Sequence, residues 1–231
     1  PARHTRNRAR GAEGRGNVAG SLGLAEVGGQ DRDFAAALAA WQTAKAPPAD
    51  GIVTEPALLA MEAGWHARRP IVAAMSQGAC PDPPDETALE AGRPGEGYGG
   101  KPVQLRRGAF AAYRAMVAAA RAEVPAIAAD PRNLTLFSAY RSPDDDAVRC
   151  AAEGNCDGVV RATCSPHRTG LAVDLYVGEA PGFGPDSSAD PNRLAQSRTP
   201  TYRWLVANAG RFGFVNYPFE PWHWEWTGEA P

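Results

Sequence analysis

The chain has 231 residues, of which 44% are apolar and 22% are charged, and its formal net charge is −2. This composition is typical of a globular protein with a hydrophobic core, and the length allows a catalytic domain with a small accessory one. A net charge near zero gives no reason to expect nucleic acid or an anionic membrane as a partner. No apolar run in the sequence approaches the ~18 residues that a membrane-spanning helix needs.

The first 68 residues divide into a predicted flexible tail and a predicted helical module. Residues 1–29 are rich in Gly and Arg without hydrophobic periodicity, which is typical of a disordered segment. In residues 30–68, three apolar side chains recur at helical spacing, namely Phe34, Leu38 and Trp41. An Asp50-Gly51 turn follows, and Pro56 suits the first turn of a second helix. This pattern resembles the peptidoglycan-binding module found beside many bacterial wall hydrolases; a helical hairpin packed on the main domain is the alternative.

The rest of the chain is predicted to be a connector followed by an α+β domain. Residues 69–100 are rich in Pro and Gly, which is typical of a connector. Within residues 101–231, the segments 107–125 and 201–214 have the apolar spacing of amphipathic helices, and 133–140 alternate like a strand. Helices and short strands in this order predict an α+β fold.

Four cysteines occur, at Cys80, Cys150, Cys156 and Cys164. They lack the CxxC spacing of a zinc ribbon or a thioredoxin-type site. An even number is compatible with disulfides in an oxidising compartment, and Cys150 with Cys156 is the easiest local pair. Four reduced, buried thiols are the alternative.

The stretch SPHRTGLAVD combines a histidine, a glycine and an aspartate. If residues 171–177 form a strand, four apolar side chains share one face and Asp174 lies on the other, beside the small Ala172. The apolar face belongs in the core, so Asp174 points away from it. Gly170 lets the chain turn sharply before the strand, so His167 and Asp174 can converge.

A second histidine lies in PWHWEW, residues 221–226. Alternation puts three tryptophans on one face of this predicted strand and His223 with Glu225 on the other. The tryptophans bury a large apolar area and would hold the histidine on a rigid support. If the two strands are neighbours, His167, Asp174 and His223 form a three-ligand site. Two imidazoles, a carboxylate and a water are a ligand set of catalytic zinc.

Three ordered motifs carry a family resemblance. SPHRTGLAVD matches the pattern SxHxxGxAxD, EPWHWEW contains a downstream ExxH segment, and SAYRS at residues 138–142 resembles a preceding SGYRS segment. Together they resemble the zinc D-alanyl-D-alanine carboxypeptidases of the VanY type, relatives of the D-Ala-D-Ala dipeptidases and of the zinc-binding hedgehog domain. The resemblance spans about residues 101–231. It implies a small antiparallel sheet with flanking helices that carries a zinc site.

The resemblance also implies roles for single residues. The zinc ligands would be His167, Asp174 and His223. Glu220 would be the catalytic base, and Arg141 would contact the substrate. Arg141 would bind the terminal carboxylate or the developing oxyanion. Ser165 would hydrogen-bond the substrate or shape the turn, and Tyr140 is a further substrate-binding candidate. Glu225 is the competing base, or a partner that orients a histidine.

One departure from the family concerns specificity. Acidic residues, Asp144–Asp146, stand where the family often has a Gln a few residues after the arginine. The resemblance therefore does not define the substrate specificity of this part of the site.

We expect a zinc metallopeptidase that hydrolyses peptidoglycan stem peptides as a D-alanyl-D-alanine carboxypeptidase. An endopeptidase that cuts cross-links or the L-Ala–D-Glu bond is one alternative, and a non-enzymatic, zinc-containing wall-binding module is another. The expected partners are peptidoglycan or its peptide precursors. We expect an extracytoplasmic monomer, in the periplasm, in the cell wall or secreted, with no nucleic acid partner and no integral membrane segment.

Overall fold

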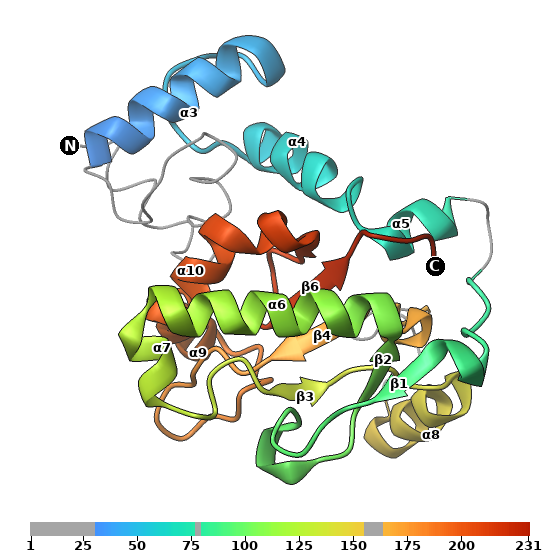
Figure 1. Ribbon diagram of the computed structural model, residues 1–231. Coiled ribbons are helices and arrows are strands. Elements are labelled where there is room, and N and C mark those ends of the chain that lie inside the picture. The colour runs from blue at the N-terminus through green and yellow to red at the C-terminus, as the bar shows by residue number, and fades with distance from the viewer. Residues whose placement is uncertain (1–30, 77–79, 155–163) are drawn as a thin grey trace.

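A computed structural model describes residues 31–76, 80–154 and 164–231 (Figure 1). The predicted tail at 1–29 lies outside these ranges, and so does the predicted pairing of Cys150 with Cys156. Within the described ranges, no helix is both long and apolar enough to span a bilayer.

Two N-terminal helices, α3 (Asp31–Lys45) and α4 (Glu55–His66), pack on each other. They share a small hydrophobic core of their own, made of Phe34, Leu38, Met61 and Trp65. Gly51 turns the chain between them with a φ of +69°, and a Cβ atom there would lie 2.4 Å from the Ala35 carbonyl oxygen. Thr54 caps α4 by accepting a hydrogen bond at 3.3 Å from a main-chain amide of the first turn. Both predicted helices are present, and their binding to peptidoglycan stays a prediction.

The larger part of the molecule is built on a four-stranded antiparallel sheet with the order β3-β4-β6-β5. Its strands are short and contain β-branched and aromatic residues, as expected for half-buried strands. They are β3 (Leu136–Ser138), β4 (Ala172–Leu175), β5 (Phe214–Asn216) and β6 (His223–Trp226).

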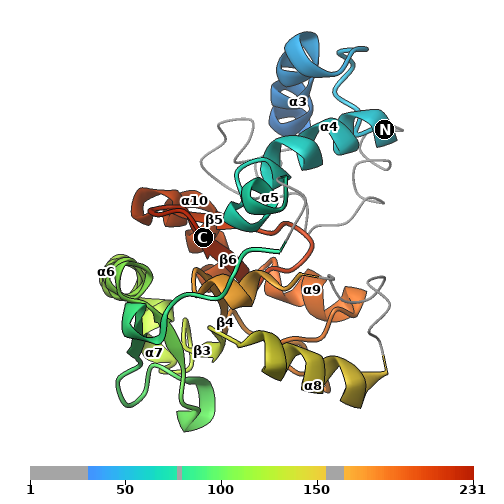
Figure 2. The same cartoon turned by 90° about the vertical axis from the view of Figure 1, so that its right-hand side faces the viewer.

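Helices cover both sides of this sheet (Figure 2). On one side lie α6 (Arg107–Glu123) and α7 (Pro125–Ala129), and on the other lie α8 (Pro143–Glu153) and α9 (Asp190–Gln196). Helix α10 (Pro200–Asn208) packs against α6 and α7. The predicted α+β fold, with a small antiparallel sheet and flanking helices, is confirmed.

The main hydrophobic core lies between α6, α10 and one face of the sheet. Its fully buried side chains include Phe110, Leu136, Leu175, Tyr202 and Phe214. Val173 and Leu175 of β4 and Trp224 of β6 also belong to it, as the alternation of the sequence predicts. The opposite face of the same two strands is therefore left with the polar residues of the two histidine motifs.

The segment between the two parts has more regular structure than its Pro/Gly content suggests. It contains α5 (Pro70–Met75), the 3-10 turns Glu86–Ala88 and Tyr98–Gly100, and β1 (Leu89–Ala91). Strand β1 pairs antiparallel with β2 (Gln104–Arg106) just before α6. The predicted strand at 133–140 is shorter than expected because Leu134 has a φ of +66°, which extended chain does not allow. The helix predicted at 201–214 ends in a 3-10 turn, Ala209–Phe212, closed by Gly213 at a φ of +82°.

A disulfide joins Cys80 to Cys164. The alternative of four reduced thiols is therefore wrong. The bond links the connector, across 84 positions of sequence, to the residue just before Ser165.

We expect Phe110→Ala to lower the free energy of unfolding by about 3–5 kcal/mol, because it removes a fully buried ring from the main core. Chemical denaturation followed by circular dichroism would measure this loss. Val148→Ala on α8 is the control, since that side chain is 72% exposed and its removal should change the free energy by less than about 0.5 kcal/mol. Equal effects of the two substitutions would contradict this account of the core.

Candidate metal centre

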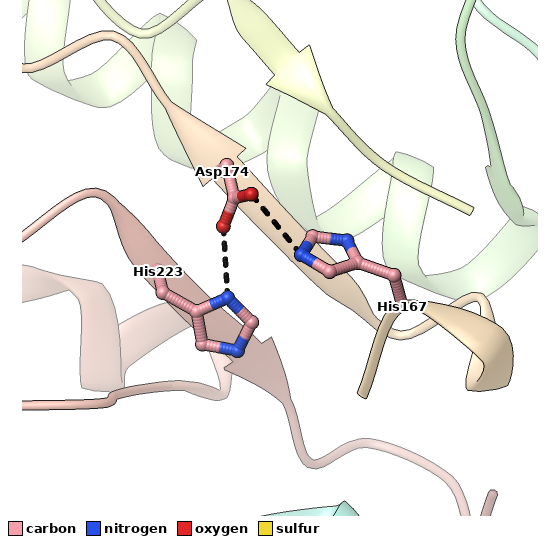
Figure 3. Close-up of side chains that lie close together, drawn as sticks. All are labelled: His167, Asp174 and His223. Carbon is pink, nitrogen blue, oxygen red and sulfur yellow. Dashed lines mark hydrogen bonds and ion pairs between the residues drawn. The ribbon is translucent and has the colours of Figure 1, made fainter. Parts of the chain in front are cut away.

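Three buried side chains converge on one point, with Asp174 between His167 and His223 (Figure 3). Asp174 Oδ2 lies 3.1 Å from His167 Nε2, and Asp174 Oδ1 lies 2.8 Å from His223 Nδ1. One ligand atom from each residue can be chosen so that all three lie within 4.8 Å of one another. Among the described residues these three form the group that could hold a metal ion.

The sheet sets two of these three positions. Strands β4 and β6 are antiparallel neighbours, and their register places Asp174 directly opposite His223. Side chains opposite each other on one face of such a pair have Cβ atoms about 4.5–5.5 Å apart. The core face of each strand, which holds Val173 and Trp224, fixes this orientation.

His167 comes from the 3-10 turn Pro166–Thr169, which precedes β4. Ser165 caps the turn by accepting a hydrogen bond from the His167 amide at 3.3 Å. Gly170 ends it with a φ of +69°, where a Cβ atom would lie 3.1 Å from the Arg106 side chain. This glycine therefore allows the sharp change of direction that brings His167 back over β4.

The outer nitrogen of each imidazole has an acceptor. His167 Nδ1 lies 2.8 Å from the Ala139 carbonyl oxygen, and His223 Nε2 lies 3.3 Å from Glu225 Oε1. Carbonyl and carboxylate oxygens only accept, so these nitrogens donate. Neutral imidazoles then direct their remaining lone pairs, on His167 Nε2 and His223 Nδ1, at the Asp174 carboxylate. Such an arrangement is repulsive unless a proton or a metal cation lies among the three groups, and it fits a metal site with oriented outer contacts.

The ionisable side chains of the site shift one another's pKa. Burial alone would raise the pKa of Asp174, but the charges and hydrogen bonds of His167 and His223 outweigh it and hold that pKa far below its usual range. Burial alone would lower the pKa of His223, but hydrogen bonds and charges from Asp174 and Glu225 raise it to about 9. The site thus favours a carboxylate next to positive charge.

Glu220 lies in the tight turn that leads into β6. Its amide donates to the Tyr217 carbonyl at 3.0 Å, and its carbonyl accepts from the His223 amide at 2.9 Å. Burial raises the pKa of the Glu220 carboxyl, an effect that His223 opposes and Asp174 adds to. These interactions mean that the half-buried Glu220 side chain lies within electrostatic reach of the metal centre.

Arg141 follows β3 and is connected to the same turn as His167. Its amide donates to the His167 carbonyl at 3.3 Å, and its guanidinium donates to Ser138 Oγ at 3.3 Å and to Ser165 Oγ at 3.1 Å. Its Nε forms an ion pair with Asp146 in the first turn of α8. The acidic stretch that departs from the family pattern is therefore in contact with the predicted substrate-binding arginine.

The two remaining side chains have less direct links to the centre. Ser165 both caps the 3-10 turn and contacts Arg141, so it shapes the turn as one of its two predicted roles requires. Tyr140 is half-buried, and its amide donates to the Gln104 carbonyl at 2.8 Å. A contact of Tyr140 with substrate stays a prediction.

Glu225 lies on the same face of β6 as His223, as predicted, and both of its oxygens have partners. Oε1 contacts Arg69 and His223, and Oε2 accepts from the Ile71 amide at 3.2 Å. This geometry favours an orienting role over that of a competing base. Arg69 was not predicted, because it lies 156 positions before Glu225 and no local pattern links the two.

Comparisons with known proteins agree with the motifs. A family model described as VanY, D-alanyl-D-alanine carboxypeptidase, matches residues 102–229. No match is found among the curated proteins. A solved structure, described as the vancomycin resistance D,D-pentapeptidase VanY from a VanB-type resistance cassette, a point mutant in complex with Zn(II), has 22% sequence identity and a TM-score of 0.37. That similarity covers 64% of this chain and 83% of the other. Because the family match takes in more than half of the sequence, the chain belongs to the VanY family of D-alanyl-D-alanine carboxypeptidases, and the predicted metallopeptidase class is confirmed.

Proposed function

We propose that this protein removes the terminal D-alanine from peptidoglycan stem peptides by zinc-dependent hydrolysis. The observation that carries the proposal is the convergence of two imidazole lone pairs and a carboxylate on one point, in a chain of this family. His167, Asp174 and His223 would hold the zinc ion. Zinc bound there supplies Lewis acidity, which makes water a competent nucleophile near neutral pH.

Glu220 would be the general base. It would take a proton from the attacking water and pass it to the amine of the departing D-alanine. A carboxyl with a raised pKa suits both steps, because it can accept a proton and then release it near neutral pH. Pro221 biases Glu220 towards extended backbone, and the Glu220–His223 hydrogen bond holds the base and a ligand in one turn.

Arg141 would bind the terminal carboxylate of the substrate. Asp146 pairs with Nε, and each Nη donates one N–H to a serine hydroxyl, which leaves its second N–H for a substrate carboxylate. A planar fork of this kind recognises carboxylates through paired hydrogen bonds. Tyr140 would contact the substrate on the same side as Arg141.

The ion pair of Arg141 with Asp146 also favours a second candidate function. An arginine whose charge is offset by an internal carboxylate attracts a free terminal carboxylate less strongly. An endopeptidase, whose substrate continues beyond the cleaved bond, has no such carboxylate to bind. A purely structural zinc module is less well supported, because Glu220 then has no role.

The setting of the enzyme follows from its substrate. Peptidoglycan stem peptides lie outside the cytoplasm, and the Cys80–Cys164 disulfide suits an oxidising compartment. The protein would act there as a monomer in the periplasm, in the cell wall or after secretion, and α3 with α4 would hold it near the wall.

His223→Ala should abolish zinc binding, because it removes one of three ligands from a buried site. Val148→Ala is the control, since that exposed side chain lies outside the ligand group. Metal analysis after dialysis would give about one zinc per chain for the wild type and for Val148→Ala, and far less for His223→Ala. Wild-type protein that holds no zinc would contradict the proposed function.

Glu220→Gln should keep its zinc and lose at least about 100-fold in kcat, because the amide cannot accept the proton from water. Mass spectrometry of a muramyl pentapeptide would follow the loss of one alanine by the wild type. Release of soluble muropeptides from intact sacculi, without trimming of the pentapeptide, would select the endopeptidase instead.

Arg141→Met should raise KM for a pentapeptide with a free terminal carboxylate by roughly 10–100-fold, the loss expected for a charge-assisted hydrogen bond of about 1.5–3 kcal/mol. The same peptide with a terminal amide is the control and should be a poor substrate for both proteins. Equal cleavage of the acid and the amide by the wild type would show that Arg141 does not read the carboxylate.

A further inference from the structure

We propose that Arg69 is a positioning residue of the metal centre. It holds Glu225 in place, and Glu225 in turn holds the His223 ring with Nδ1 directed at the metal position. This inference rests on the proposed zinc site. It assigns part of that site to a residue that precedes the segment matched by the family, residues 102–229.

Arg69 contacts Glu225, and Glu225 contacts His223. Arg69 donates to Glu225 Oε1 from Nε and from Nη2, each at 2.6 Å. The same oxygen lies 3.3 Å from His223 Nε2. Oε2 accepts from the Ile71 amide at 3.2 Å. Both carboxylate oxygens are thus fixed by residues 69–71, and the imidazole is oriented by the carboxylate.

Because these side chains are buried, each of them needs its partner. Glu225 is 1% exposed and Arg69 is 7% exposed. A buried carboxylate needs a partner, because removal of one member of such a pair leaves a charge without compensation at a cost of several kcal/mol. Without Arg69, Glu225 would turn towards another partner and release the His223 ring.

Arg69 is itself held in one position. Its guanidinium lies 4.3 Å from the centroid of the Tyr217 ring, and its Nη1 lies 3.4 Å from His66 Nδ1. His66 lies against Tyr217 and Phe219, in the turn that leads to Glu220. A lysine could not reproduce these contacts, because it lacks the planar fork that meets a carboxylate while lying on a ring.

The surrounding segment approaches both histidine motifs. Arg69 is the N-cap of α5, which lies beside β6 in both views (Figures 1 and 2). Helix α5 also contacts the 3-10 turn that carries His167. The disulfide joins Cys80, which follows α5, to Cys164, two residues before that turn. Residues 66–76 and Cys80 therefore contact the segments that carry both histidines of the metal centre.

The test compares Arg69→Met and Arg69→Lys with a control, Arg114→Met. Arg114 forms ion pairs with Glu90 and Glu96 that are only partly buried and do not touch the metal centre. Zinc affinity would be measured by competition with a chromophoric chelator, and the visible spectrum of the Co(II)-substituted protein would report ligand geometry. Thermal unfolding would confirm that each variant is folded.

Arg69→Met should weaken zinc binding about 10-fold, the lower end of the effect of outer-contact mutations, and should change the Co(II) spectrum. Arg69→Lys should give a smaller loss, and Arg114→Met should leave both readouts at wild-type values. Wild-type affinity and spectrum in a folded Arg69→Met, or an equal change in Arg114→Met, would overturn the inference. If Arg69→Met does not fold, Arg69→Lys decides by the same criterion. A wild type that binds no zinc would instead count against the proposed function.

Discussion

The antiparallel pairing of β4 with β6 determines where the chemistry of this protein lies. Its register places Asp174 opposite His223, and the core packing of Val173 and Trp224 turns both polar side chains to the other face. A slip of one residue would exchange the two faces, so the tryptophans that stabilise the sheet also determine the positions of the proposed metal ligands. Stability and function therefore depend on the same register.

Around that pair, backbone geometry supplies the rest of the centre. The turn closed by Gly170 positions His167, and the turn between Glu220 and His223 positions the proposed base. Each imidazole is oriented from outside, one by the Ala139 carbonyl and the other by Glu225. The proposed ligands are thus held by main-chain structure and buried ion pairs, which is the support that a preorganised site needs.

Local patterns predict the parts of this arrangement that depend on neighbouring residues. Period-2 alternation puts Asp174 and His223 on the polar faces of their strands. Helical spacing predicts α3 and α6, and Pro56 predicts the start of α4. Only the family motifs predicted that the two strands are neighbours, because no local sequence pattern shows that Asp174 pairs with a residue 49 positions later. The Arg69–Glu225 ion pair and the Cys80–Cys164 bond escaped prediction for the same reason: each depends on tertiary contacts between distant segments.

The buried acid on β6 limits how freely this catalytic unit can be recombined with other modules. A fragment that starts near residue 102 carries every family motif but leaves Glu225 without its cationic neighbour. A transplanted peptidase domain would therefore have to include α5 and the residues around it, or carry a neutral side chain at position 225. The structural unit that supports the site therefore begins upstream of the segment that contains the family motifs.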